Sequence, residues 1–266
     1  GVRHAWWISN RLDKPLICHQ RDTYRRDRFH FGLSRVDHVI AISKYVLETL
    51  PPKLRQKSTM IYNATAIPAA ENIKDLATGP EPVRLGMAGR CTSDKGQDLF
   101  IRALNRLEER DVTFQAAIWG LPNPAKRDDF ADALLTQGRS LGEKLKFEGF
   151  RSDIETFYQW ADVVAVPSRF KEPFGRMAIE AMSWARPVVV AAHGGLTEIV
   201  TDGEDGLAVA PLDSDALADG LERLVLDGDL RRRVGENARK TVLERFTLTQ
   251  HAQQIEQFYA DVLDGR

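Results

Sequence analysis

The sequence has few cysteines, almost no net charge and no long apolar run. Cys18 and Cys91 are far apart and form no Cys-x-x-Cys pair, so the sequence offers no disulfide framework or cysteine metal motif and indicates a reducing compartment. The net charge of -1 gives no reason to expect a nucleic-acid partner. No apolar run approaches the roughly 18 to 20 residues that a membrane-spanning helix needs. We therefore expect a cytoplasmic protein that binds no nucleic acid.

Short apolar runs alternate with amphipathic segments along most of the 266 residues. Hydrophobic residues make up 43% of the chain and charged residues 28%, as in an ordinary globular protein. Strands separated by helices of about ten to fifteen residues are typical of βαβ units, so the pattern predicts an α/β fold with parallel, doubly wound sheets. We expect strands at 83–89, 113–119, 144–147, 163–167, 187–192 and 207–210, and helices at 97–110, 127–141, 152–160, 214–226 and 230–246.

The first 65 residues repeat this alternation on a smaller scale. Helices are expected at 2–12, 25–33 and 44–50, and strands at 16–19, 38–42 and 59–62. Three short parallel strands expose two sheet edges and offer little core, so this unit lacks the first part of a domain or is a minimal domain that another chain completes. The segment 64–82 is rich in Ala, Pro, Thr and Gly, which predicts an interdomain linker.

Two carboxylates stand near an expected helix start in the stretch 167–182. Glu172 and Glu180 have seven residues between them. Pro173 biases Glu172 towards extended backbone, and a helical pattern begins at about Arg176. A helix N-terminus attracts anions, so carboxylates beside it predict a ligand that is part anion and part polyol, such as a sugar nucleotide. Two alternatives stay open at this point: a solvated Glu180, or the carboxylate pair of a glycosidase.

A second candidate site is the loop 89–96, between an expected strand and an expected helix. Arg90 offers a planar fork of donors and Lys95 a point charge, which together suit a diphosphate. The loop is not a Walker motif, because Asp94 stands where a glycine should precede Lys95. The alternative interpretation is a basic surface loop ahead of a capped helix.

A third candidate is the pair Gly194 and Gly195, which follows the strand expected at 187–192. Two glycines before a helix start let backbone amides approach a ligand at the carboxyl edge of a parallel sheet. The alternative is a plain turn in which Thr197 caps the next helix.

Taken together, these motifs resemble the family 4 retaining glycosyltransferases of the GT-B type. The resemblance covers nearly the whole chain. It is carried by Glu172-Pro-Phe-Gly with Glu180-Ala-Met, Gly89-Arg90 with Lys95-Gly96, 147–150, 161–163, Gly194-Gly195, and 202–203 with Gly206. One departure is Ala64, which follows Asn63 where the family usually has Asn-Gly.

The resemblance implies a GT-B-like α/β fold of two Rossmann-like domains with parallel sheets, the N-terminal one incomplete. Residues 1–70 would be part of the acceptor-side domain and 71–245 the domain that binds a nucleotide sugar. Residues 246–266 would form a helix that crosses back to the first domain. Phe258 and Val262 belong to an apolar stripe that this helix could bury.

The resemblance also implies an activity. The protein would be a retaining glycosyltransferase that moves a sugar from a UDP- or GDP-linked donor to a glycan or lipid-linked acceptor, as in polysaccharide biosynthesis. No cofactor and no metal are expected, because cationic side chains and helix termini carry the charge. The alternatives are a nucleotide-sugar-binding module without turnover and a GT-B-fold sugar-nucleotide epimerase.

Site residues follow from the same resemblance. Arg90 and Lys95 would hold the donor diphosphate, Glu180 the ribose hydroxyls and Glu172 the transferred sugar. His19 would face that sugar from the acceptor side, unless it is a strand-end histidine with a structural hydrogen bond. The catalytic set is His19, Arg90, Lys95 and Glu172, and the donor-binding set is Gly89, Arg90, Lys95, Glu172, Pro173, Phe174, Gly175, Glu180, Gly194 and Gly195.

Four arginines cluster after His19, at positions 21, 25, 26 and 28. They could touch anionic headgroups at the inner face of a membrane, since related enzymes often act there on lipid-linked acceptors. Asp22 and Asp27 dilute the cluster, so a solvated helix face is the alternative. Ser43 matches a serine of the family and equally suits a helix cap. Arg231 is expected on an exposed helix face.

Overall fold

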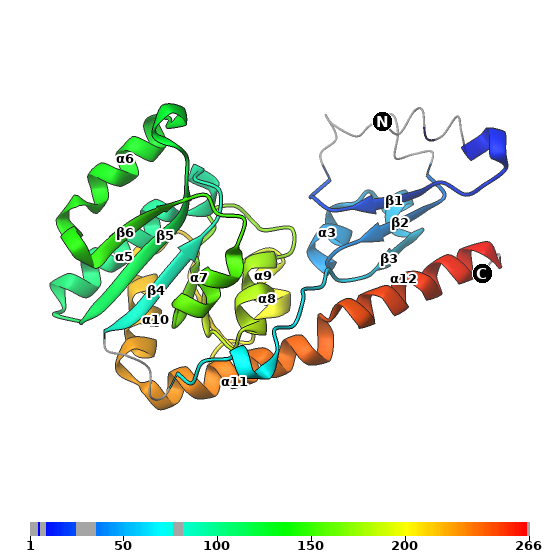
Figure 1. Ribbon diagram of the computed structural model, residues 1–266. Coiled ribbons are helices and arrows are strands. Elements are labelled where there is room, and N and C mark those ends of the chain that lie inside the picture. Colours follow the sequence, from blue (N-terminus) through cyan, green and yellow to red (C-terminus); the bar gives the residue numbers. More distant parts are fainter. Residues whose placement is uncertain (1–4, 6–8, 25–35, 77–81, 265–266) are drawn as a thin grey trace.

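Two parallel β-sheets organise the protein (Figure 1). The computed structural model describes residues 5, 9–24, 36–76 and 82–264. The larger sheet has the strand order β6-β5-β4-β7-β8-β9 and the smaller one the order β1-β2-β3. The larger sheet comprises β4 (Val83–Ala88), β5 (Phe114–Leu121), β6 (Leu145–Gly149), β7 (Val163–Val166), β8 (Val188–Ala191) and β9 (Leu207–Val209). All of these pairings are parallel, as the alternation of strands and helices predicted.

Helices cover both faces of the larger sheet, because its central strands β7 and β8 are apolar on both sides. Val163 of β7 packs into the core beneath one face, and the next residue, Val164, packs into the core beneath the other. The helices are α5 (Gln97–Glu109), α6 (Asp129–Gln137), α7 (Ile154–Trp160), α8 (Arg176–Ser183), α9 (Leu196–Ile199), α10 (Ser214–Leu226) and α11 (Gly228–Arg245). Apolar residues of α5, α6 and α10 belong to the first core, whereas those of α7, α8 and α9 belong to the second.

The smaller sheet contains β1 (Ile17–Gln20), β2 (His38–Ala41) and β3 (Ser58–Met60), with α3 (Lys44–Thr49) and α4 (Pro52–Arg55) between β2 and β3. Ser43 caps α3 by accepting a hydrogen bond from the amide of Val46 at 2.9 Å, as one of its two interpretations predicted. The helix expected at 25–33 lies outside the described residues. Of the helix expected at 2–12, residues 9–12 are described and are helical.

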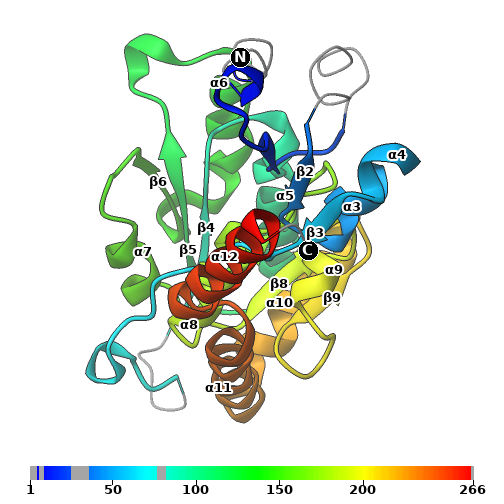
Figure 2. The same cartoon turned by 90° about the vertical axis from the view of Figure 1, so that its right-hand side faces the viewer.

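A long C-terminal helix, α12 (Leu248–Leu263), joins the two units. Figures 1 and 2 show it leaving the end of α11 and finishing beside the small sheet. Phe258 packs there with Ile40 and Ile61. The helix begins with a capping box formed by Thr247 and Gln250. These contacts place the C-terminal part of α12 against the smaller sheet.

The segment after Asn63 is attached to the larger unit by three arginines. Arg239 donates to the carbonyl of Pro68 at 2.9 Å, and Arg186 to that of Lys74 at 3.4 Å. Arg231 donates to the carbonyl of Leu76 at 3.2 Å. The expectation of an exposed Arg231 was wrong: the residue is 6% exposed, because its guanidinium also reaches two carbonyls at the end of α10.

The helix expected over 127–141 is divided. Regular α6 ends at Gln137, and a 3₁₀ segment, Gly138–Lys144, follows it. Gly142 adopts φ 51° and ψ -130° inside that segment, which no α-helix accommodates. The apolar periodicity therefore continued past the point where the backbone turns.

Candidate functional site

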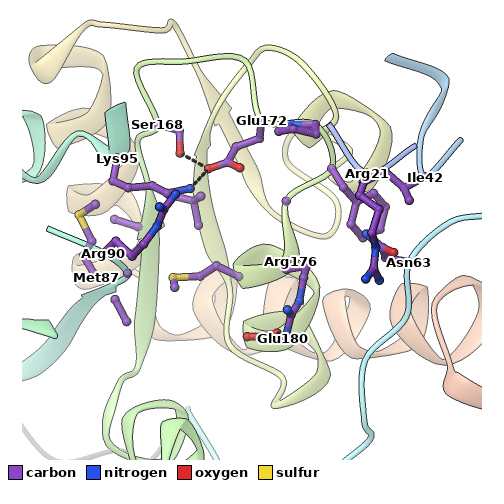
Figure 3. Close-up of a pocket in the computed structure, with 18 residues that line it drawn as sticks. Arg21, Ile42, Asn63, Met87, Arg90, Lys95, Ser168, Glu172, Arg176 and Glu180 are labelled. Atoms are coloured by element: carbon purple, nitrogen blue, oxygen red, sulfur yellow. Dashed lines mark hydrogen bonds and ion pairs between the residues drawn. The ribbon is translucent and has the colours of Figure 1, made fainter. Parts of the chain in front are cut away.

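A cavity of about 550 Å³ opens between the two units (Figure 3). Its floor lies at the carboxyl ends of β4 and β7, the edge where open parallel sheets bind ligands. The smaller unit contributes Arg21, Ile42 and Asn63. The larger unit contributes Met87, Ala88, Gly89, Arg90, Lys95, Ala165, Val166, Ser168, Glu172, Pro173, Phe174, Gly175, Arg176, Met177 and Glu180.

The loops that follow β4 and β7 are fixed to each other. Gly96 adopts φ 80°, and a Cβ at this position would overlap the carbonyl oxygen of Pro167. The amide of Arg169 donates to the carbonyl of Asp94 at 2.8 Å. The guanidinium of Arg169 pairs with both carboxylate oxygens of Asp98. The loop of Lys95 and the loop of Glu172 therefore form one rigid wall.

An ion pair crosses this wall. Lys95 Nζ lies 2.7 Å from Glu172 Oε1, and the Ser168 hydroxyl donates to the same oxygen at 2.7 Å (Figure 3). The two charged side chains are 22% and 13% exposed, so water screens the pair only partly. An ammonium group has three donors, so Lys95 can keep Glu172 and still bind an anion.

Arg90 lies beside this ion pair in Figure 3. The side chain of Gln97 donates to the carbonyl of Arg90 at 2.7 Å, which holds the backbone in place. Within the part of the chain that the structure describes, the Arg90 guanidinium makes no ion pair. A cation that the protein leaves unpaired in a cavity suits an anionic ligand.

Glu180 is held by two residues that sequence reasoning missed. The hydroxyl of Tyr158 donates to Glu180 Oε2 at 2.9 Å, and Arg176 donates to Oε1 at 2.8 Å. Burial raises the pKa of Tyr158, so its hydroxyl stays protonated and remains a donor. The i, i+4 spacing could have revealed Arg176, whereas no local pattern links Tyr158 to Glu180.

The three residues between Glu172 and Arg176 contribute in different ways. Gly175 precedes α8 with φ 122°, a conformation that favours glycine. Phe174 is 2% exposed, and its ring packs against Tyr62 and Phe246, with centroids 5.9 and 5.8 Å away. Phe174 also lines the cavity, although most of its ring belongs to the core. Pro173 lines the cavity, as does Gly89 after β4.

Gly194 and Gly195 were expected to contact the donor directly, but they do not line the cavity. The amide of Gly195 donates to the carbonyl of Glu172 at 2.8 Å. A Cβ at Gly194 would stand 2.7 Å from that same carbonyl oxygen. Both glycines therefore support the Glu172 loop from behind. Thr197 is no helix cap either, because α9 starts after Gly195 and the Thr197 hydroxyl donates to the carbonyl of Gly194 at 2.9 Å.

His19 is exposed on β1 and is not among the residues that line the cavity. Its Nε2 lies 3.2 Å from the hydroxyl of Tyr259 on α12. Partial burial of the ring lowers the pKa of His19 below its usual 6.5, and the positive charges of Arg21 and His251 lower it further. The neutral imidazole is therefore favoured at neutral pH.

Replacing Arg21 with alanine is expected to raise the pKa of His19, because removal of a nearby positive charge stabilises the imidazolium. An NMR pH titration of the His19 ring measures this shift. Arg21→Lys keeps the charge and serves as the matched control. An unchanged pKa in Arg21→Ala would contradict a role for the Arg21 charge and leave burial and His251 as the causes.

Glu198 of α9 joins the larger unit to the smaller one. Its carboxylate accepts hydrogen bonds from the backbone amides of Lys44 at 2.8 Å and Tyr45 at 2.7 Å. These are the first two residues of α3. The Tyr62 hydroxyl donates to the same carboxylate at 3.1 Å. Nearby, Ser43 donates to the carbonyl of Pro173 at 2.5 Å. A carboxylate of one unit thus caps a helix of the other, beside the Glu172 loop.

We expect Glu198→Ala to destabilise the chain by about 1–2 kcal/mol, since it leaves two helix amides without their acceptor. Urea denaturation gives the free energy of unfolding. Glu244→Ala is the control, because Glu244 is an exposed residue whose carboxylate lies 4.0 Å from Lys240. Equal stabilities of the two variants would argue against a role for Glu198 in joining the units.

The described residues contain neither a cluster suited to a metal ion nor a helix suited to span a membrane. No group of three or more His, Cys, Asp or Glu side chains in that part of the chain is arranged to hold a metal ion. None of its helices combines the length and apolar character needed to cross a membrane.

The sequence model for "Glycosyl transferases group 1" matches residues 69–241. The chain belongs to this glycosyltransferase family. A D-inositol 3-phosphate glycosyltransferase from Corynebacterium aurimucosum is 35% identical over 183 residues, which are 67% of this chain and 43% of that relative. An α-D-kanosaminyltransferase from Streptomyces kanamyceticus is 30% identical over 176 residues, which are 65% of this chain and 44% of that protein. The chain thus spans less than half the length of these two relatives.

Solved glycosyltransferase structures have the same fold. The Anabaena protein HepE, in complex with UDP and glucose, has a TM-score of 0.83 and 25% identity, over 97% of this chain and 75% of that one. Sucrose-phosphate synthase from Thermosynechococcus elongatus has a TM-score of 0.80 and 25% identity, over 98% of this chain and 72% of that one. The resemblance to GT-B glycosyltransferases and the expected α/β fold with parallel sheets are therefore confirmed.

Proposed function

We propose that this member of the glycosyltransferase family binds a nucleotide-diphosphate sugar in the cavity and transfers its sugar, with retention, to a glycan or lipid-linked acceptor. The observation that carries the proposal is the ion pair of Lys95 and Glu172 at the carboxyl edge of the sheet. It joins a cation suited to phosphate with a carboxylate suited to sugar hydroxyls. HepE was solved with UDP and with UDP-glucose, which favours a UDP-linked donor over a GDP-linked one.

In this proposal each side chain has a definite task. Arg90 and Lys95 stabilise the negative charge that grows on the diphosphate as the sugar–phosphate bond breaks. Glu180, fixed by Tyr158, accepts hydrogen bonds from the vicinal ribose hydroxyls. Glu172 binds hydroxyls of the transferred sugar.

Retention is proposed to follow from substitution on one face of the sugar. The leaving phosphate takes the proton of the acceptor hydroxyl as that hydroxyl attacks the anomeric carbon, so Glu172 need not act as a nucleophile. Metal and cofactor are not part of the proposed step, since Arg90, Lys95 and the start of α8 supply positive charge at the site. His19 remains the proposed residue on the acceptor side.

Titration calorimetry with UDP, GDP, UDP-glucose and GDP-mannose tests the proposal. We expect a uridine nucleotide to bind. When the chain is incubated with the donor and acceptor sugars, we expect chromatography to show that the donor is consumed. Failure of all four nucleotides to bind would contradict the proposal. Binding without donor consumption would instead indicate a nucleotide-sugar-binding module.

A further inference from the structure

The smaller unit supplies one wall of the cavity, through Arg21, Ile42 and Asn63. Figure 3 shows Arg21 and Asn63 on the side opposite Arg90 and Lys95. The proposed donor groups lie on the other wall and on α8. The wall of the smaller unit is therefore the surface that faces a second substrate.

The charges that line the cavity are unevenly paired. Lys95 is paired with Glu172, and Arg176 with Glu180. Within the described part of the chain, Arg21 makes no hydrogen bond or ion pair through its side chain. Arg90 is the other unpaired cation, but it lies next to Lys95. A donor diphosphate that binds Arg90 and Lys95 leaves the positive charge of Arg21 without an anionic partner.

Asn63 gives a second, independent indication of a ligand on this wall. The residue is only 9% exposed, and it lines the cavity. Its carboxamide makes no hydrogen bond to any residue that the structure describes. Neither its nitrogen nor its oxygen is among the buried polar atoms that lack a partner, so the amide is open to the cavity, where it can donate to and accept from a ligand.

We propose that Arg21 and Asn63 form an acceptor subsite that takes an anionic acceptor, one with a phosphate or carboxylate close to the hydroxyl that receives the sugar. The planar guanidinium of Arg21 matches two oxygens of such a group. The Asn63 amide binds a neighbouring hydroxyl, for which it offers both a donor and an acceptor. This inference rests on the proposed function, because it assigns the second substrate of the same cavity.

The test uses the whole chain saturated with UDP, so that the diphosphate occupies Arg90 and Lys95. NMR titrations then measure dissociation constants for glucose, glucose 6-phosphate and glucuronate. We expect the two anionic sugars to bind about tenfold more tightly than glucose, the gain of a charge-assisted contact. Vesicles of phosphatidylcholine with and without phosphatidylglycerol distinguish a lipid-borne anion from a soluble one.

Variants separate the two residues. Arg21→Ala is expected to abolish the preference for anionic ligands and to leave UDP affinity unchanged. Asn63→Ala is expected to lower the affinity for glucose and the affinity for glucose 6-phosphate by the same factor. Arg223→Ala, an exposed arginine of α10, is the control for a general loss of charge.

Three results would overturn the inference while leaving the proposed function standing. One is equal affinity of the wild-type chain for glucose and glucose 6-phosphate. The second is an anion preference that survives in Arg21→Ala. The third is a loss of UDP affinity in Arg21→Ala, which would place Arg21 in the donor site. Absence of UDP binding to the wild-type chain would contradict the proposed function itself.

Discussion

Replacing Lys95 with alanine is expected to weaken UDP binding by about ten- to a hundredfold, equivalent to about 1.5–3 kcal/mol. Lys95 is one of two cations on the phosphate side of the cavity, and it is only 22% exposed. A charge-assisted contact in a partly desolvated position contributes more than one at the surface. Titration calorimetry of the purified variant measures the loss.

Two further variants make this result specific. Lys171→Ala removes an exposed lysine next to Glu172 and is expected to leave UDP affinity nearly unchanged. Glu180→Ala is expected to weaken UDP binding less than Lys95→Ala does. It removes hydrogen bonds to the ribose but leaves the diphosphate contacts intact. Equal UDP affinity of wild type and Lys95→Ala would remove Lys95 from the diphosphate site.

Local sequence was sufficient to predict features that depend on neighbouring residues. Pro173 and Gly175 indicated an extended segment and then a helix from about Arg176, and α8 begins at that residue. The alternation of strands and helices predicted the parallel sheet, because parallel neighbours are joined by helical crossovers. Motif spacing also identified the family, which the family match over 69–241 confirms.

Contacts between distant segments could not be predicted in the same way. Tyr158 and Glu180 come from different helices, and Glu198 meets the start of α3 across the two units. Neither contact leaves a periodic signal, because each depends on how separate elements pack. Arg231 shows the reverse error: its charge suggested a surface position, but its two terminal nitrogens donate to carbonyl groups at the end of α10 and to the carbonyl of Leu76.

Gly96→Ala is expected to cost about 2–5 kcal/mol of unfolding free energy, the sum of a left-handed backbone and a steric overlap. Gly96 has φ 80°, and an added Cβ would overlap the carbonyl oxygen of Pro167. Gly203 is a matched control, since its φ is 76° and no atom lies within 4 Å of an added Cβ. Gly203→Ala should therefore cost only about 1–2 kcal/mol, for the backbone alone. Urea denaturation of both variants measures the difference, and equal losses would rule out the overlap.

The same substitution connects folding to the site. Relief of the overlap requires the carbonyl of Pro167 to move, and Ser168 and Glu172 follow it along the same loop. Gly96→Ala should then weaken UDP binding as well, by separating Glu172 and Ser168 from Lys95. If the effect passes through Lys95, the double variant with Lys95→Ala will lose less UDP affinity than the sum of the two single losses. Additive losses would mean that Gly96 and Lys95 act independently, so that the rigid wall does not position the cation.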